Sequence, residues 1–69
     1  MKIENDKDDN LIVDLGRVKV AYIFSERSIR VINAKTGEVL RKDPVNDPED
    51  FTIKDFQDSV NHYKQMMGI

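Results

Sequence analysis

The sequence contains no cysteine, no tryptophan and a single histidine. The absence of cysteine excludes disulfide bonds and thiolate chemistry, and it is compatible with a reducing compartment. No apolar run reaches the length of about 7 to 15 residues that the core of a signal peptide needs, or the roughly 20 residues of a membrane-spanning helix. We therefore expect a cytoplasmic protein with no membrane segment.

No catalytic or metal-binding constellation can be assembled from the residues present. His62 has no cysteine to activate, and on a helix it would share a face only with Asp58, whereas a metal site takes three or four ligands. The three glycines are scattered, so that they form no phosphate-binding loop. We expect neither an enzyme nor a bound cofactor or metal ion.

The chain has 69 residues, which is enough for one small domain. A domain of this size buries only about 60% of the surface that its unfolded chain exposes. Such domains usually depend on disulfides, a metal or a partner chain for part of their stability. Because disulfides are excluded and no metal site is predicted, oligomerisation or binding to a partner is the remaining route.

Two consecutive β-hairpins are predicted within residues 17–42. Runs rich in Val, Ile, Tyr and Phe are interrupted there by two short polar clusters, a pattern typical of strands and turns. The second turn is the clearer one, because Asn33 can bond the backbone two residues on and Gly37 can adopt a positive φ. The three strands would span 17–25, 28–33 and 38–42. The first would turn one apolar face inward, made of Val18, Val20, Tyr22 and Phe24.

The residues before these hairpins differ in composition. Residues 1–10 contain only Ile3 as an apolar residue besides Met1, so the sequence predicts a flexible acidic arm. Residues 11–15 are mostly apolar, and their odd positions could face a core if this segment forms a fourth strand. Gly16 then marks a bulge or a turn at which the alternation shifts by one residue.

One amphipathic helix is predicted at the C-terminus. Residues 43–50 contain two prolines and form a linker that ends the third strand. Thr52 can cap the helix, with Asp55 as its partner in a capping box; an alternative start has Asp47 as the cap and Pro48 as the first helical residue. Apolar residues then recur at spacings of three and four, namely Ile53, Phe56, Val60, Tyr63 and Met67.

These patterns define the expected fold class. It is α+β, with a three-stranded antiparallel β-meander, or a four-stranded one if residues 11–15 form a strand, packed against one C-terminal amphipathic α-helix. Residues 11–69 would form a single small α+β domain. The apolar stripe of the helix would cover the sheet; the alternative is that this stripe docks in a groove of a partner or self-associates.

The net charge of −2 conceals an uneven distribution. Residues 11–41 carry more Lys and Arg than Asp and Glu, whereas both flanking segments carry an excess of acids. The acids either neutralise part of the sheet or leave a basic face for a nucleic acid or an acidic protein. The acidity of the whole chain, and the place of Tyr22 and Phe24 on the face that the helix would cover, argue against nucleic acid.

The segment from Val31 to Pro44, VINAKTGEVLRKDP, resembles the FlaG family of flagellar proteins. The order of features over residues 20–67 is similar: a strand pair, a turn with Thr-Gly-Glu-Val, an Arg, a Pro and then a C-terminal amphipathic helix. The resemblance implies a non-enzymatic accessory role in flagellar filament assembly, exerted through protein contacts.

The sequence favours binding to a protein partner over any other function. On the second face of the sheet, Ile23 and Ile32 would form an apolar centre flanked by Arg30 and Arg41, the composition that protein interfaces favour. Coverage of this face by residues 11–15 or by the tail is the alternative. Homodimerisation would be the simplest outcome. The open functional alternatives are a FlaG-like accessory, a phage- or prophage-type regulator or inhibitor that binds a larger protein, and nucleic-acid binding through the basic hairpins.

Overall fold

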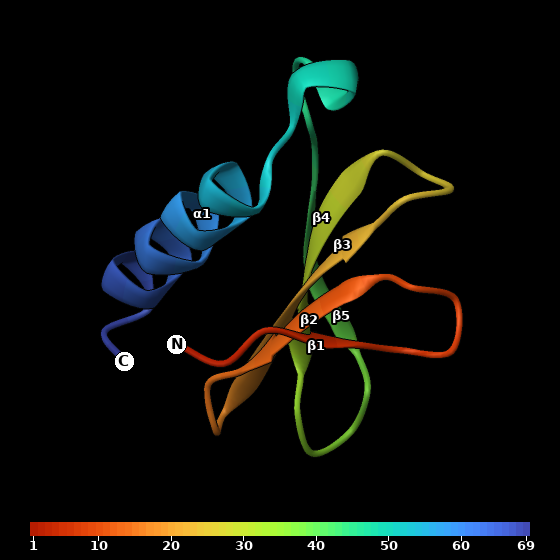
Figure 1. Ribbon diagram of the computed structural model, residues 1–69. Coiled ribbons are helices and arrows are strands. Elements are labelled where there is room, and N and C mark those ends of the chain that lie inside the picture. The colour runs from red at the N-terminus through yellow and green to blue at the C-terminus, as the bar shows by residue number, and fades with distance from the viewer.

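A computed structural model describes all residues from 1 to 69 and consists of one antiparallel sheet and one α-helix (Figure 1). The sheet is a meander in which each strand pairs with the next along the chain, in the order β1-β2-β3-β4-β5. The predicted fold class, an α+β meander with a C-terminal helix, is confirmed, but the sheet has five strands where the sequence predicted three or four. The elements are β1 (Glu4–Asn5), β2 (Leu11–Asp14), β3 (Val18–Ile23), β4 (Ser28–Asn33), β5 (Val39–Pro44), the 3-10 helix η1 (Pro48–Asp50) and α1 (Ile53–Met66).

The fourth strand that the sequence left open is present as β2, which pairs with β3 along its whole length. Gly16 has a φ of 92°, and the amide of Leu15 donates to the carbonyl of Val18 at 2.9 Å. Gly16 and Arg17 therefore form a two-residue hairpin loop, and only the first of them has a positive φ, as in a type II′ turn. This turn places the odd residues of β2 and the even residues of β3 on the same face of the sheet.

The additional strand is β1, within the segment where composition predicts a flexible arm. Glu4 and Asn5 pair with β2, and Ile3 packs against the core. The turn that follows is built around Asp6, whose Oδ1 accepts from the amides of Asp8 (2.8 Å) and Asn10 (3.0 Å). These bonds lower the pKa of Asp6, and the largest cause is the hydrogen bond from the side chain of Asn10. The structure thus gives the arm contacts that its composition does not predict.

The turn between β4 and β5 has the predicted chemistry. Oδ1 of Asn33 accepts from the amides of Lys35 (2.9 Å) and Thr36 (3.1 Å), and Gly37 has a φ of 80°. Beyond the turn, Val39 pairs with Ile32 and Arg41 with Val31, so that Leu40 is an extra residue in β5. This β-bulge changes the alternation of β5 and decides which face of the sheet each later side chain occupies.

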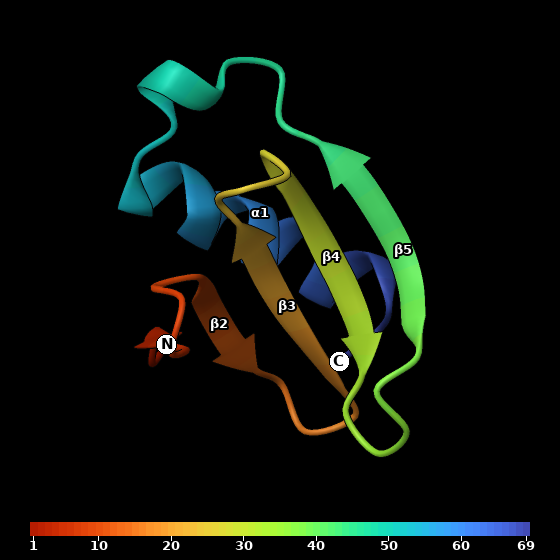
Figure 2. The same cartoon turned by 90° about the vertical axis from the view of Figure 1, so that its right-hand side faces the viewer.

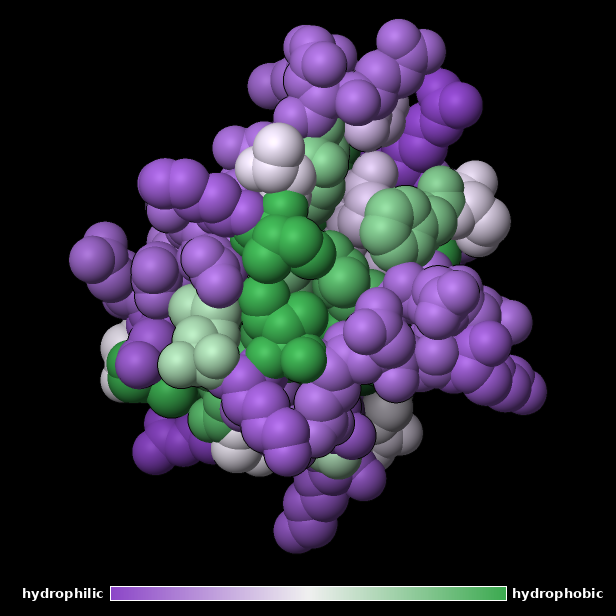
Figure 3. Space-filling view, viewed as in Figure 1, coloured by the Kyte–Doolittle hydropathy of each residue, from purple (hydrophilic) through white to green (hydrophobic).

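The core lies between α1 and one face of the sheet. Phe56 and Val60 of α1 are fully buried, and Tyr63 is buried beside them. Burial of one large apolar side chain contributes about 1.5–3 kcal/mol, so this cluster is the main source of stability. Figure 3 shows an apolar area where α1 and the sheet meet, framed by polar residues. The strand residues of the core are Leu11, Val13, Val18, Val20, Tyr22, Ile29 and Val31.

Two predictions about the core need correction. Phe24, expected to face inward, is 51% exposed, because β3 ends at Ile23 and Phe24 begins the following loop. Its ring only touches the edge of Tyr22, while Phe51 from the linker stacks on Tyr22 with ring centres 4.5 Å apart. In α1, only the middle of the predicted stripe is buried, since Ile53 is 52% exposed and Met67 is also exposed.

The start of α1 has the predicted capping box. The amide of Asp55 donates to Oγ1 of Thr52 at 3.2 Å, and the amide of Thr52 donates to Oδ2 of Asp55 at 2.9 Å. The alternative start is also used, but by the separate helix η1, for which Asp47 is the cap and Pro48 the first residue. With 14 residues, α1 is too short and too polar to cross a membrane.

Candidate docking surface

The sheet has a second face that no other element covers. Figure 2 shows this surface toward the viewer, with α1 behind the sheet. We call it the back face. The register aligns Ile12, Ala21, Arg30 and Lys42 in one row across four strands, and Lys19, Ile32 and Val39 in the next. Because successive residues of a strand point to opposite faces, these side chains alternate with those of the core.

The centre of the back face is aliphatic. Ile12, Ile23 and Ile32 are half-buried there, and Val39 is 45% exposed. Ala21, on the middle strand, is only 1% exposed, although no element lies over it. Its cross-strand neighbours flank its methyl group on both sides. The small Ala21 side chain therefore makes the apolar centre of the back face shallow, and this centre is already partly shielded from water.

The back face carries three cationic side chains, and one carboxylate pairs with two of them, Arg30 and Lys42; the third, Lys19, lies on the middle strand β3. Glu26, in the loop between β3 and β4, accepts from Arg30 and lies 3.2 Å from Nζ of Lys42. The hydrogen bond from Arg30, followed by that from Lys42, lowers the pKa of Glu26. Nε of Arg30 is buried without a hydrogen-bond partner, so this guanidinium lies down along the sheet. Arg30 and Lys42 are thus ordered before any partner binds, which reduces the entropy lost on binding.

The structure brings together three of the four predicted contact residues. Ile23, Arg30 and Ile32 all lie on the back face, but Arg41 does not. Arg41 pairs with Val31, whose side chain is in the core, and it therefore faces α1. There it forms an ion pair with Asp43 at 2.6 Å, and its guanidinium lies 3.9 Å from the sulfur of Met66.

Sequence reasoning missed several members of the back face. The sequence did not place Ile12 on this face because it does not show which strand residues 11–15 pair with. It did not place Lys42 there because the bulge at Leu40 reverses the alternation of β5. The available signal was the period of two within 11–15, which places Ile12 opposite the core residues. The bulge has no such signal, since it depends on how β5 pairs with β4.

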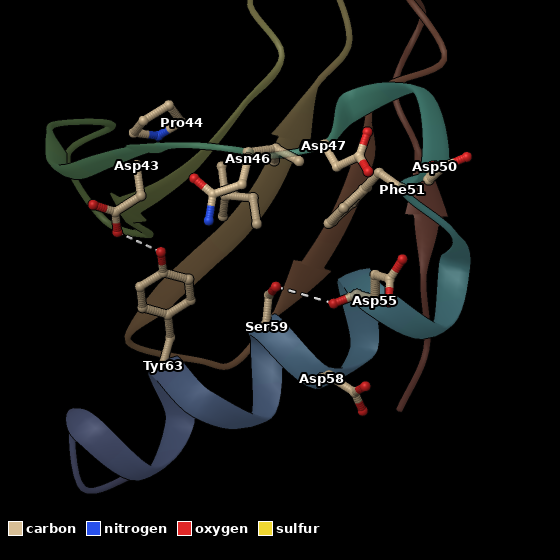
Figure 4. A pocket seen from close by; sticks show the side chains of 12 residues that line it. Asp43, Pro44, Asn46, Asp47, Asp50, Phe51, Asp55, Asp58, Ser59 and Tyr63 are labelled. Atoms are coloured by element: carbon tan, nitrogen blue, oxygen red, sulfur yellow. Dashed lines mark hydrogen bonds between the residues drawn. The ribbon is translucent and has the colours of Figure 1, made fainter.

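A pocket of about 500 Å³ lies on the other side of the molecule, between the end of β5, the linker and α1 (Figure 4). The lining includes the aromatic residues Phe51 and Tyr63 and five aspartates, namely Asp43, Asp47, Asp50, Asp55 and Asp58. No group of three or more His, Asp or Glu side chains is arranged to hold a metal ion. The five carboxylates are thus spread over the lining of the pocket.

The strongest electrostatic coupling in the pocket joins Tyr63 and Asp43. The Tyr63 hydroxyl donates to Oδ2 of Asp43, and burial together with this bond raises the pKa of Tyr63 to about 12. The same bond, followed by the one from Arg41, lowers the pKa of Asp43. General acid–base catalysis needs a pKa near the working pH. Both groups are moved away from neutral pH, so the pair suits a structural contact between β5 and α1.

Comparison with known proteins gives no match. No protein-family model, no curated protein and no solved structure is significantly similar to this chain. The resemblance to the FlaG family therefore stays a prediction, and the functional argument depends on the geometry of the back face.

Proposed function

We propose that this chain is a non-enzymatic protein-binding module and that the back face is its docking surface. The observation that carries the proposal is the aliphatic centre of this face. When an antiparallel sheet has one face packed on a core, the other face usually alternates to polar residues. Here four apolar side chains, those of Ile12, Ile23, Ile32 and Val39, lie among the charged residues of the uncovered face. Exposed apolar patches on small proteins mark interaction sites.

The magnitudes indicate how strong such binding would be. Complete burial of one of these side chains contributes about 1.5–3 kcal/mol, and those already half-buried have roughly half of that left to gain. The four together contribute about 3–6 kcal/mol, which at best reaches the lower part of the cost of about 4–15 kcal/mol for lost translation and rotation. The aliphatic centre alone therefore gives weak binding, and the ordered cations Arg30 and Lys42 must add contacts at its margin.

Nucleic acid is a poorer candidate for this surface. Glu26 neutralises part of the charge of Arg30 and Lys42, and Tyr22 is buried on the opposite face of the sheet, where no base can stack on it. A protein-binding back face would serve either of two roles. One is that of a filament accessory, as the FlaG resemblance implies, and the other is that of a small regulator.

Photo-crosslinking tests the proposal. We would place a benzoylphenylalanine at Val39, on the back face, and in a matched control at Asn61, on the exposed side of α1. The proposal predicts crosslinks to a second polypeptide from position 39 and few from position 61, and the identity of the captured chain separates an accessory role from a regulatory one. Crosslinks from position 61 alone would refute the docking surface.

A further inference from the structure

The sheet ends at two strands, β1 and β5, whose outer edges carry no further strand. β1 has only two residues, whereas β5 has six and lies at the margin of the sheet in Figure 2. The outer edge of a strand presents unpaired N–H and C=O groups, on which an extended segment of another chain can add as a further strand. β5 is therefore the edge at which strand addition has to be considered.

The pairing of β5 with β4 determines which backbone groups of β5 point outward. In an antiparallel pair, positions that exchange hydrogen bonds alternate with positions that do not, and the backbone groups of the latter point away from the partner strand. The amide of Val45 donates to the carbonyl of Arg27 at 3.0 Å, so this is a hydrogen-bonded position. By this alternation Pro44 and Lys42 are outward positions of β5, with Asp43 between them.

Pro44 removes the donor from one outward position. Proline has no backbone N–H, and within sheets it is found at edges or bulges, where the ladder does not need that donor. The missing N–H of Pro44 would have pointed away from β4. Pro44 therefore costs β5 no hydrogen bond to β4, but it leaves only a C=O group for an incoming strand.

The bulge at Leu40 breaks the spacing of the outward positions on the other side of Lys42. The amide of Asn33 donates to the carbonyl of Glu38 at 2.7 Å, which makes this a hydrogen-bonded position. Val39 is the next residue of β5, and its backbone groups therefore point outward. Outward positions of a regular strand are two residues apart, but the inserted Leu40 sets Val39 and Lys42 three apart. A regular incoming strand cannot pair with both.

We infer that β5 is blocked against strand addition and that this edge binds no extended segment of a partner. In any one register, an incoming regular strand finds a single residue, Val39 or Lys42, with both donor and acceptor in place. Bulges, prolines and lysines are the features by which edge strands avoid association, and β5 combines all three. The inference goes beyond the proposed function, because it concerns the mode of binding and holds whichever face carries the docking surface.

Amide hydrogen exchange of the wild-type chain tests the assignment of the outward groups. The amides of Val39 and Lys42 have no partner strand, whereas those of Arg41 and Asp43 face β4. The first two should therefore exchange at least about tenfold faster than the second two. Equal protection of all four amides would overturn the inference. So would protection of Lys42 that grows with protein concentration, because this amide would then be paired with another chain.

A variant with an open edge tests the block itself. In this open-edge variant Leu40 is deleted, and Lys42→Thr and Pro44→Thr are introduced. Positions 39, 42 and 44 then all carry an N–H group at the spacing of a regular strand. The deletion retains the other pairs of β5 with β4, because the bulged residue has no partner of its own. The matched control carries Lys64→Thr and Pro48→Thr, which change the same residue types outside the sheet.

Sedimentation equilibrium from micromolar to millimolar concentration measures association, and circular dichroism verifies folding. The open-edge variant should associate at least about tenfold more tightly than wild type, because each newly paired residue adds hydrogen bonds. The amides at positions 39 and 42 should become protected in the associated form, and the control should behave as wild type does. A folded open-edge variant that associates no more than wild type would overturn the inference.

A second variant keeps the test decisive if deletion of Leu40 unfolds the chain. It carries only Lys42→Thr and Pro44→Thr, and it therefore keeps the bulge while providing two successive outward positions with donors. It too should associate more tightly than wild type, and a folded variant that does not would contradict the block. These measurements use the purified chain alone, so their failure is distinct from failure of the crosslinking that tests the back face.

Discussion

The substitution Val60→Asp tests whether α1 packs on the sheet as described. Val60 is fully buried in the middle of α1, between Phe56 and Tyr63. Its replacement removes about 1.5–3 kcal/mol of apolar burial. A carboxylate in this position would take up a proton, and holding an acid of ordinary pKa about 3.9 protonated at about pH 7 costs about 4 kcal/mol more. The total loss is about 6–7 kcal/mol.

This loss is comparable with the whole stability of the domain. At about 0.05–0.15 kcal/mol per residue, a chain of 69 residues has a free energy of unfolding of about 3–10 kcal/mol. We therefore expect Val60→Asp to be largely unfolded at neutral pH, as measured by circular dichroism and thermal denaturation. Val60→Ala removes apolar burial without adding a charge and should remain folded. Asn61→Asp adds the same charge on the exposed side of α1 and should have little effect.

A cooperative melt of Val60→Asp within a few degrees of wild type would refute the packing of α1. A melt of Asn61→Asp as strongly lowered as that of Val60→Asp would also contradict it, because the effect would then come from added charge alone.

Three further predictions concern contacts outside the centre of the core. The hydroxyl of Tyr63 has an ordinary pKa of 10.0 and a pKa of about 12 in the folded chain, so the unfolded chain loses this proton first as the pH rises. The stability that this difference contributes should be complete below pH 10 and be lost as the pH rises to about 12. The loss should be about 1–2 kcal/mol once solvent screening is included. In Tyr63→Phe this alkaline loss should disappear from denaturant titrations, and an unchanged pH profile would contradict the assignment. Thr52→Ala should cost about 1 kcal/mol through loss of the cap, whereas Thr52→Ser should retain most of it, and equal losses in urea denaturation would argue against the capping bond. Deletion of residues 1–9 should lower the stability by about 1–2 kcal/mol, since it removes β1 and the packed Ile3, and an unchanged melting temperature would show that this segment contributes nothing.

Local interactions account for what the sequence predicted well. The turn at Asn33 and Gly37 and the capping box of Thr52 and Asp55 are each formed by residues within a few positions of one another. The amphipathic stripe centred on Val60 is likewise a property of one segment. In such cases residue type and spacing determine the conformation, and the tertiary structure only has to accommodate it.

The features that the sequence did not predict depend on contacts between distant segments. Glu4 and Asn5 have no strand-like pattern, and β1 exists because the turn at Asp6 returns the chain to β2. Phe24 continues the alternation of β3, but the strand ends before it. The bulge at Leu40 arises where β5 meets β4, and it moves Arg41 from the predicted docking surface to the side of α1.

Methyl NMR of the isoleucines, recorded with and without the polypeptide that crosslinks from position 39, tests the central claim most directly, because the back face and α1 carry separate probes. Ile12, Ile23 and Ile32 lie on the back face, and Ile53 is an exposed control on α1. If the back face is the docking surface, the methyl signals of the first three residues shift when that polypeptide is added, while that of Ile53 stays fixed. Shifts confined to Ile53, or signals that all stay unchanged when that polypeptide is in excess, would contradict the account.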